Sequence, residues 1–598
     1  MKHKLLLYCS VLLMIMLLLC GLCGCKQTPK ELAPPQNVCV DKRVVTWDKD
    51  AHASGYAVRI KQKEYEITDC SFSIHSMTTE GGRYTIDVLA LGDGKQYEDS
   101  AWTRITVELE PAVAEGYDEA QFRYVLLEDG SGYEVSRGYA DLEGVITIPA
   151  FFGDYPVKRI AEKAFFYDVF GANCFTEEYC NIATTGVVLP DTLESIGANA
   201  FACMVRLKEI TIPDSVVSIE GGAFAGCTHM THVTLPRGLE EIPNRCFEDT
   251  ALAEIVFPNS LKKIGESAFL CRYYDMSAYD APDVIGHIYS DLTSISLPDS
   301  LEYIGRVAFS GRESLAEIHC SDNFDVEFFD SGVFKETKWL DEQPVGLIVL
   351  GVVLYSHKGT IPSLMIEVPS TVKTIAGGAF AYQKAVEAIV LPEGVKLAGP
   401  SIFDHCESLS TIKLPEGNTI IYHNMLAYTY ALKEVIIPST VTLIEPHAFY
   451  KSGIEQLTVP SSVKEIDKNA FSGCEGLIEV YLSDGLEVLF ENAFSNCYNL
   501  VKIRLPNTLK ELKSYTFGRC NAQEIVIPRS FKTIQYYAFS EAPLSRVYFE
   551  GTLEELNEIV NAQKSNPFSD AILYCYSEQA PTEEGNFWHY VDGIPTVW

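Results

Sequence analysis

One short pattern recurs along most of this 598-residue sequence, in the form I-P-x-S-V-x-x-I-x-x-x-A-F-x-x-C. Taking the Phe of the A-F pair as a marker, ten of the intervals between successive markers are 22 or 23 residues long. A period this constant predicts a solenoid, because each repeat can bury its apolar side only against its neighbours. The markers are Phe165, Phe201, Phe224, Phe247, Phe269, Phe309, Phe334, Phe380, Phe403, Phe449, Phe471, Phe494, Phe517 and Phe539, with Leu426 in the gap after Phe403.

A single repeat, Leu207–Phe224, shows how the chain is expected to coil. Its apolar residues at L-x-x-I-x-I spacing predict a short strand, which ends at Pro213 because proline cannot donate to a ladder. Val216 and Ile219 then bring the chain back along the other side, and Phe224 closes the coil. Stacked coils place Phe on Phe and Ile on Ile, about 4.8 Å apart.

The repeated string resembles the BspA-type leucine-rich repeat of bacterial surface proteins, also called the Treponema pallidum type. The resemblance covers residues 117–598, with an opening repeat at Phe122–Phe165 and a terminal strand pair in WHYVDGIPTVW. It implies a mainly β fold, a leucine-rich repeat solenoid of short stacked parallel strands. It also implies adhesion to host proteins or other cells, through a ligand that varies across the family.

Residues 1–24 have the layout of a secretory signal peptide, in which basic residues precede an apolar run that ends at Leu19. The sequence LCGC, which ends at Cys25, resembles the bacterial lipobox, whose cysteine receives the lipid. We therefore expect export and attachment to a membrane by acyl chains on Cys25, at the start of a linker that covers residues 25–31. A plain cleaved signal peptide is the alternative.

Residues 32–110 alternate apolar and polar side chains in runs that turn residues separate, which predicts a small β-sandwich. Trp47, Tyr56 and Tyr84 carry a resemblance to a fibronectin type III domain. The resemblance implies a spacer or a docking module.

Two intervals between markers are longer than the rest, because insertions lie near residues 166–185 and 272–291. Both begin just after the A-F corner, so we expect them on the same edge of the solenoid, about 20 Å apart. Two aromatic, acidic loops on one edge would suit a ligand site, whereas neutral drift of loops is the alternative. The candidate contact residues are Tyr167, Tyr179, Tyr273, Tyr274 and Tyr279.

A third irregularity covers residues 323–362. The interval from Phe334 to Phe380 is 46 residues, twice 23, which predicts one degenerate repeat in register.

A cysteine follows the A-F pair in many repeats. Thiols on a linear ladder do not converge on one point, as a zinc ion would require. We therefore expect these cysteine side chains to be buried and to fill space in the core, with a disulfide between neighbouring rungs as the alternative. The pair Cys174 and Cys180 differs, because its spacing inside an exported loop permits a local disulfide. The cysteines of the ladder are Cys203, Cys227, Cys271, Cys406, Cys474, Cys497 and Cys520.

Charge and motifs limit the possible functions. The 47 Lys and Arg residues against 81 Asp and Glu residues give a net charge of −34, which repels nucleic acid. The sequence holds no H-E-x-x-H, no G-x-S-x-G and no G-x-G-x-x-G that opens a helix. We therefore expect no catalytic residues, no metal, no cofactor and no nucleic-acid partner.

Together these features predict a lipid-anchored surface protein whose solenoid binds an extracellular or host protein or glycan. A second hypothesis is a glycan-handling accessory protein or hydrolase, with a site between the two insertions. A third is a structural spacer.

Overall fold

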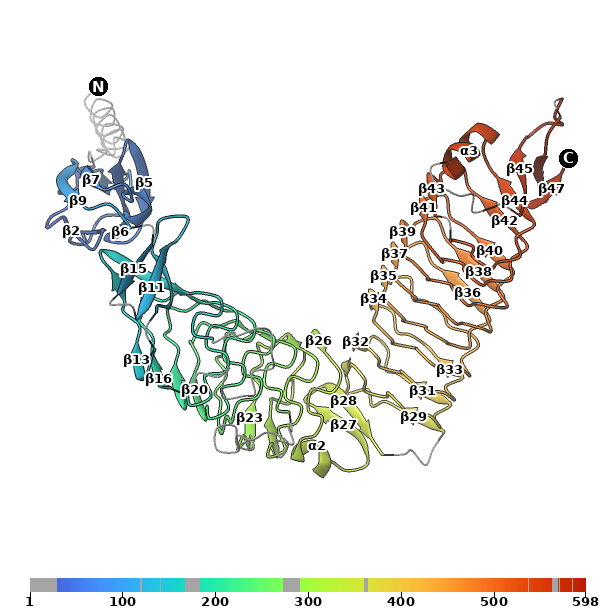
Figure 1. Cartoon of the computed structure of the whole chain (residues 1–598), viewed down its shortest axis with the longest axis horizontal. Coiled ribbons are helices and arrows are strands. Elements are labelled where there is room, and N and C mark those ends of the chain that lie inside the picture. Colours follow the sequence, from blue (N-terminus) through green and yellow to red (C-terminus); the bar gives the residue numbers. More distant parts are fainter. Residues whose placement is uncertain are drawn as a thin grey trace, which may run out of the picture. The chain divides into compact units, whose positions relative to one another are not determined.

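The computed structural model describes residues 29–113, 115–118, 121–139, 141–166, 183–272, 291–359, 364–535, 537–561, 568, 570–582 and 584–598. The chain is mainly β, as the repeats predict, and it divides into two compact units (Figure 1). Within the described ranges, no helix is long and apolar enough to span a bilayer. Unit 1 comprises Met1–Leu142, Ile148–Ala161 and Pro190–Leu193, and unit 2 comprises Glu143–Thr147, Glu162–Leu189 and Glu194–Trp598.

Unit 1 begins with two antiparallel sheets that share one core. Val45 from one sheet and Ile86 from the other are fully buried in it, and the rings of Trp47 and Tyr56 meet edge to face at 5.3 Å. Trp47 and Tyr56 are therefore core residues, as is Tyr84. The first sheet contains β2 (Cys39–Asp41), β3 (Val44–Thr46) and β6 (Ser71–Ser73); the second contains β5 (Lys63–Ile67), β4 (Gly55–Ile60), β7 (Gly82–Leu91) and β9 (Thr103–Leu109); a separate parallel pair joins β1 (Lys30–Glu31) to β8 (Tyr97–Glu98), and a short 3-10 helix covers His75–Met77.

The second part of unit 1 is a small sheet with an aromatic core. The ring of Tyr124 stacks on that of Phe152 at 4.3 Å, and Tyr133 meets Phe152 edge to face at 5.1 Å. Its strands are β10 (Glu115–Asp118), β11 (Phe122–Leu126), β12 (Tyr133–Arg137), β14 (Phe151–Phe152) and β15 (Tyr155–Ile160).

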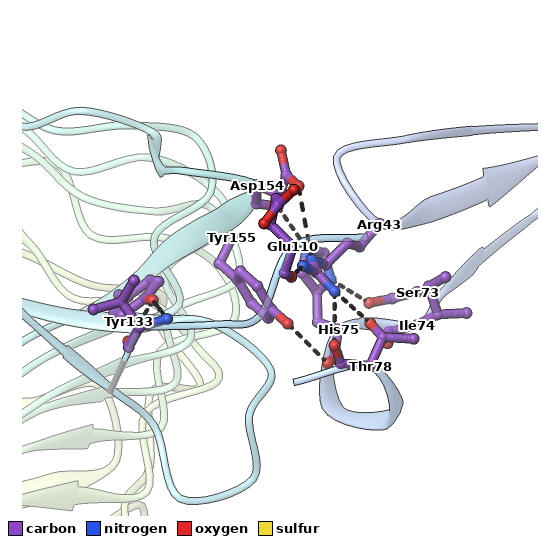
Figure 2. A network of polar contacts seen from close by, with 10 residues as sticks. Arg43, Ser73, Ile74, His75, Thr78, Glu110, Tyr133, Asp154 and Tyr155 are labelled. Atoms are coloured by element: carbon purple, nitrogen blue, oxygen red, sulfur yellow. Dashed lines mark hydrogen bonds and ion pairs between the residues drawn. The ribbon is translucent and has the colours of Figure 1, made fainter. Parts of the chain in front are cut away.

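Arg43 joins these two parts of unit 1, as Figure 2 shows. Only 1% of its surface is exposed. Its Nη1 donates to the main-chain oxygen of Thr78 at 2.8 Å, and its Nη2 donates to the main-chain oxygen of Glu110. The guanidinium lies over the ring of Tyr155, with 4.5 Å to the centroid, and near the carboxylate of Asp154 at 3.9 Å. Because one buried cation bonds to both parts, they pack as one body.

Unit 2 is a solenoid in which most regular repeats contribute a strand to each of two series of parallel ladders (Figure 1). This confirms the stacked parallel strands expected from the repeats. The first series contains β13 (Gly144–Thr147), β16 (Thr184–Val188), β18 (Glu209–Thr211), β20 (His232–Thr234), β23 (Ser294–Ser296), β25 (Glu317–His319), β29 (Met365–Glu367), β31 (Ala388–Val390), β33 (Thr411–Ile412), β36 (Gln456–Val459), β38 (Glu479–Leu482), β40 (Lys502–Arg504), β42 (Glu524–Ile527), β44 (Arg546–Phe549), β45 (Ile572–Tyr576) and β46 (Phe587–Val591), followed by the antiparallel β47 (Ile594–Val597).

The second series lies on the return path of each coil. Its strands are two or three residues long, and each ends shortly before the A-F corner. They are β17 (Ser195–Ile196), β19 (Ser218–Ile219), β21 (Glu241–Ile242), β22 (Lys263–Ile264), β24 (Tyr303–Ile304), β26 (Phe328–Phe329), β30 (Thr374–Ala376), β32 (Lys396–Ala398), β34 (Ile420–Ile421), β35 (Leu443–Ile444), β37 (Glu465–Ile466), β39 (Val488–Leu489), β41 (Glu511–Leu512) and β43 (Thr533–Ile534). The helix α3 (Leu553–Asn561) follows β44.

The marker phenylalanines stack inside unit 2. The rings of Phe201, Phe224, Phe247 and Phe269 follow one another at centroid distances of 5.4 Å and stay close to parallel. Leu426 takes the place of a ring, so no phenyl contact joins Phe403 to the markers after it. The described rings form three columns: Phe165 to Phe334, Phe380 with Phe403, and Phe449 to Phe539.

The cysteines of the ladder are buried, and their thiols also make hydrogen bonds. The thiol of Cys227 donates to the main-chain oxygen of Phe201 at 3.2 Å, one rung back, and Cys474 donates to that of Phe449 at 3.1 Å. Cys406, Cys497 and Cys520 repeat this bond. The described cysteines form no disulfide with one another. The thiol thus fills space and also satisfies a buried carbonyl.

Residues 323–358 depart from the expected degenerate repeat. They contain the helix α2 (Lys338–Glu342) and an antiparallel hairpin of β27 (Gly346–Leu350) and β28 (Val353–Lys358). Two short apolar runs flank a tight turn, at which Gly351 has a φ of 57°, and this combination favours a hairpin over a coil. The register is still recovered, because β28 pairs in parallel with β30.

Candidate functional site

The residues that the sequence singled out for binding and attachment cannot be placed. They are Cys25, Tyr167, Cys174, Tyr179, Cys180, Tyr273, Tyr274 and Tyr279, and all lie outside the described residues, as does most of both insertions. The candidate site is therefore built from the solenoid itself.

A series of ring contacts crosses successive repeats on the corner that follows each marker. The ring of Tyr382 stacks on that of His405 at 4.7 Å, and His405 stacks on Tyr428 at 4.1 Å. Tyr428 then meets Tyr450 edge to face at 5.4 Å. We call these four residues, together with His447 and His423, the aromatic band. Tyr382 is 62% exposed and the other five residues of the band are partly exposed.

The first three residues of the band occupy a special backbone position. Tyr382, His405 and Tyr428 each lie two residues after a marker, and their φ angles are 66°, 56° and 57°. The same position holds glycine in some repeats, such as Gly226 and Gly473, both at 74°, and other residues with a Cβ atom in several more. A left-handed conformation costs a residue with a Cβ atom roughly 1–2 kcal/mol. The backbone conformation is thus shared by most repeats, and what distinguishes these three successive repeats is that the residue there is aromatic.

The main chain holds these three rings in fixed register. The amide of Tyr382 donates to the oxygen of Asp404 at 2.8 Å, and the amide of His405 donates to that of Ala427 at 3.0 Å. Tyr428 donates in the same way to Tyr450 at 2.8 Å. Each ring therefore projects from backbone that is bonded to the next rung.

Charged groups lie along the band. The ammonium of Lys451 lies over the ring of Tyr428 at 5.6 Å and over that of Tyr450 at 5.4 Å. The carboxylate of Asp404 contacts Nδ1 of His405 at 2.8 Å. Burial raises the pKa of Asp404, while the neighbouring His405 lowers it. The band thus combines ring faces with charges of both signs.

Toward the other end, two histidines extend the band. His447 meets Tyr450 at 5.3 Å and His423 at 5.5 Å, both edge to face. Burial, and then the nearby His423, lowers the pKa of His447, so its imidazole is neutral at physiological pH. His423 also lines a hollow of about 410 Å³.

This hollow, which we call the polar hollow, lies between residues far apart in sequence. Phe328, in β26, meets Tyr422, just after β34, edge to face at 5.7 Å. β26 is the last strand of its sheet and β34 is the first of another, so the hollow opens where one ladder ends. Besides these two rings, its lining includes Arg306, Asp330, His423, Asn424 and Glu445.

Two glycines allow the rungs to approach closely beside the polar hollow. A Cβ atom at Gly399 would lie 2.5 Å from the main-chain oxygen of Phe329, and one at Gly377 would lie 2.9 Å from Cδ of Pro400. Neither distance is tolerable for a real Cβ atom. The glycines therefore bring Pro400 up to β26 and shape this wall.

The carboxylates of the polar hollow are partly desolvated. Asp330 accepts a hydrogen bond from the amide of Ser331 at 2.6 Å, and Glu445 accepts one from the amide of His423 at 2.8 Å. Burial raises the pKa of Asp330 and of Glu445, although these hydrogen bonds oppose the change. Arg306 pairs with Glu266 at 2.6 Å. No cluster of three or more metal-ligating side chains occurs among the residues described.

Sequence reasoning missed the aromatic band because the interpretation followed the marker and its cysteine. The column two residues after each marker contained the signal, since it reads Tyr382, His405 and Tyr428 in succession. The polar hollow left no such signal, because Phe328 and Tyr422 become neighbours only where the ladders break.

Comparisons with known proteins agree with the repeat pattern. The family described as BspA type Leucine rich repeat region, in six copies, matches residues 168–282, 286–342, 355–478 and 473–566. No curated protein matches the chain.

Several solved structures are similar. A leucine rich cell surface protein from Faecalibacterium prausnitzii is 19% identical over 75% of this chain and 98% of its own, with a TM-score of 0.24. A leucine-rich repeat protein from Eubacterium ventriosum is 20% identical over 71% of this chain and 94% of its own, with a TM-score of 0.31. The T. pallidum Leucine Rich Repeat protein is 19% identical over 49% of this chain and 90% of its own, with a TM-score of 0.23.

Proposed function

The chain belongs to the BspA-type leucine-rich repeat family, and from this premise we propose that it is a bacterial cell-surface protein that binds an extracellular macromolecule through the aromatic band. Under this proposal, residues 1–24 direct export, lipid on Cys25 anchors the chain, and the fibronectin type III-like sandwich serves as a spacer.

The observation that carries the proposal is the row of Tyr382, His405 and Tyr428 at left-handed positions. Tyrosine is among the residues that contribute most to binding energy at protein surfaces, because it offers a large apolar face and a hydroxyl. Glycine or asparagine at these positions would relieve the backbone strain, as Gly473 and Asn496 do two residues after other markers. A binding role accounts for the choice of aromatic side chains in three successive repeats.

The rigidity of the band supports the same role. Main-chain bonds between rungs fix all three residues before any partner arrives, so binding costs little conformational entropy. The charge of the chain limits the partner, since a net charge of −34 disfavours strongly anionic macromolecules.

The test uses the chain from Lys26 to Trp598 and a triple variant in which Tyr382, His405 and Tyr428 are changed to Asn. Asparagine tolerates the left-handed conformation, so the fold should be retained. We expect the unmodified chain to bind at least one of a panel of immobilised extracellular-matrix proteins and glycans by surface plasmon resonance, and the triple variant to lose that signal.

The matched control is Tyr515→Asn. Tyr515 is also exposed and left-handed, and its ring stacks on that of Tyr537 at 5.0 Å, but it belongs to a different part of the solenoid. Binding should survive in this variant. Equal binding by the triple variant and the unmodified chain would refute the proposal.

A further inference from the structure

We propose that the polar hollow between Phe328 and Tyr422 is a subsite for an uncharged saccharide unit, so that the macromolecule bound by the aromatic band is a neutral glycan. This inference rests on the proposed function and adds the chemical class of the ligand.

The size and lining of the polar hollow suit such a unit. Its volume of about 410 Å³ falls in the range of small-molecule sites. Phe328 and Tyr422 supply apolar ring surface, while Asp330, Glu445 and Asn424 supply polar groups around it. A sugar ring has the matching surface, because its C–H faces are apolar and its rim carries hydroxyls.

The polar groups match hydroxyls in particular. A hydroxyl both donates and accepts, and the polar hollow offers carboxylate oxygens that accept beside an amide that can do either. Asp330 and Glu445 each hold one bond from a main-chain amide, which fixes their orientation and leaves further acceptor capacity on each carboxylate. Groups oriented in advance of binding discriminate strongly in favour of a ligand with hydroxyls.

The charges exclude acidic sugars. Asp330, Glu445 and Glu266 all line the polar hollow, and the cation there, Arg306, already pairs with Glu266. A uronic or sialic acid would place a carboxylate beside partly buried carboxylates, and such like-charge contact is costly. A simple amine would satisfy the carboxylates, but it has no acceptor for the amide of Asn424.

The polar hollow is continuous with the aromatic band. His423 lines the hollow and contacts His447, which contacts Tyr450, which contacts Tyr428. A ligand seated between Phe328 and Tyr422 can therefore continue along ring faces across several rungs. This continuity favours a glycan chain over a single free sugar.

The experiment screens the chain from Lys26 to Trp598 on an array of neutral oligosaccharides, their sialylated or uronic counterparts, and polylysine. Isothermal titration calorimetry then compares the best neutral oligosaccharide with the variants Tyr422→Ala, Glu445→Gln and Tyr515→Asn. We expect binding to neutral probes alone, at least a tenfold loss in Tyr422→Ala, a loss of several-fold in Glu445→Gln, and no change in Tyr515→Asn.

A second variant covers the possibility that Tyr422→Ala unfolds locally. Tyr422→Phe keeps the ring and removes the hydroxyl, and it should keep most of the affinity. Circular dichroism should show the same strand signal in every variant.

Three results would overturn the inference. They are preferential binding of the acidic probes, preferential binding of polylysine, and a neutral oligosaccharide whose affinity is equal in Tyr422→Ala, Glu445→Gln and the unmodified chain. Binding of a protein through the aromatic band, with no glycan bound, would refute the saccharide subsite and leave the proposed function standing. Failure to bind any of these probes would refute the saccharide subsite, and failure to bind the matrix proteins as well would refute both proposals.

Discussion

Nε of Arg312 donates a hydrogen bond to the main-chain oxygen of Phe269 at 2.6 Å, and so takes over the bond that a cysteine thiol makes in other repeats. Its other nitrogens donate to the main-chain oxygens of Thr250 and Phe247. The side chain is fully buried. One residue therefore satisfies three carbonyls on the two preceding rungs.

Replacing Arg312 with Ala should lower the free energy of unfolding by about 3 kcal/mol, because the buried carbonyls of Phe269 and Thr250 lose this donor, while that of Phe247 keeps the hydroxyl of Thr250. Arg312→Cys should recover part of that loss, since a thiol at this position reaches the carbonyl one rung back. Urea unfolding followed by circular dichroism measures both variants. Equal stability of Arg312→Ala and the unmodified chain would contradict this account.

Tyr382→Asn should leave the stability unchanged or raise it by about 0.5 kcal/mol, while it weakens binding. The exposed ring contributes little to the core, and asparagine adopts the left-handed conformation at lower cost. Thermal unfolding measures the first effect and surface plasmon resonance the second. A marked loss of stability would show that the ring serves the fold instead of a partner.

The sequence pattern predicted the solenoid because each repeat is built from residues that are close together along the chain. Phe224 and its neighbours repeat at a fixed interval, and burial against the next rung follows from that interval alone. The cysteine was correctly expected to be buried, but its bond to Phe201 was not foreseen. That bond depends on where a carbonyl one rung back points, which no spacing shows.

The hairpin of β27 and β28 escaped prediction for a related reason. An interval of twice 23 residues matched the period, although Gly351 between two short apolar runs favoured a hairpin. The polar hollow could not be predicted from the sequence, since Phe328 and Tyr422 lie 94 residues apart along the chain and meet only across a break in the ladders.

The carboxylates of the polar hollow should make stability depend on pH. Burial raises the pKa values of Asp330 and Glu445 above their ordinary values of 3.8 and 4.5. The stabilisation from their neutral forms is therefore complete below those values and is lost as the pH rises through the raised pKa values. The double variant Asp330→Asn with Glu445→Gln should lose this dependence and be more stable than the unmodified chain at neutral pH.

Urea unfolding of both chains from about pH 4 to about pH 7 measures the difference. All other carboxylates are the same in both chains. The difference between the two pH profiles of unfolding free energy therefore reports on the polar hollow alone. Parallel pH profiles would contradict the prediction.

His75 should make the stability of unit 1 depend on pH in the opposite direction. Its Nδ1 lies 2.6 Å from Oγ of Ser73, and its Nε2 lies 3.2 Å from the main-chain oxygen of Asp154, as Figure 2 shows. Because Nε2 faces a carbonyl, it donates, and the neutral ring accepts at Nδ1. Burial lowers the pKa of His75 below 6.5.

The stabilisation from neutral His75 is therefore complete above pH 6.5 and is lost as the pH falls through the lowered pKa. Hydrogen exchange of the amides of unit 1 should speed up in acid, after correction for the intrinsic rate. His75→Gln offers an acceptor and a donor in similar places without a charge, so it should remove the effect. An unchanged profile in that variant would rule out His75 as its source.

The thiols of the ladder should resist alkylation in the folded chain. Burial raises the pKa values of Cys406, Cys474 and Cys520 to about 12, so almost no thiolate is present at neutral pH. Cys39 is exposed. Iodoacetamide followed by peptide mass spectrometry should find Cys39 modified first and the ladder cysteines modified only in a urea-unfolded control. Their rapid modification in the folded chain would contradict this prediction.

The three phenyl columns have a mechanical consequence. Inside a column each ring stacks on at least one neighbour, so neighbouring rungs resist extension together. At the β27–β28 hairpin and at Leu426 the column is interrupted. A chain pulled from both ends would therefore unfold first at these two interruptions, and the repeats of each column would then unfold together.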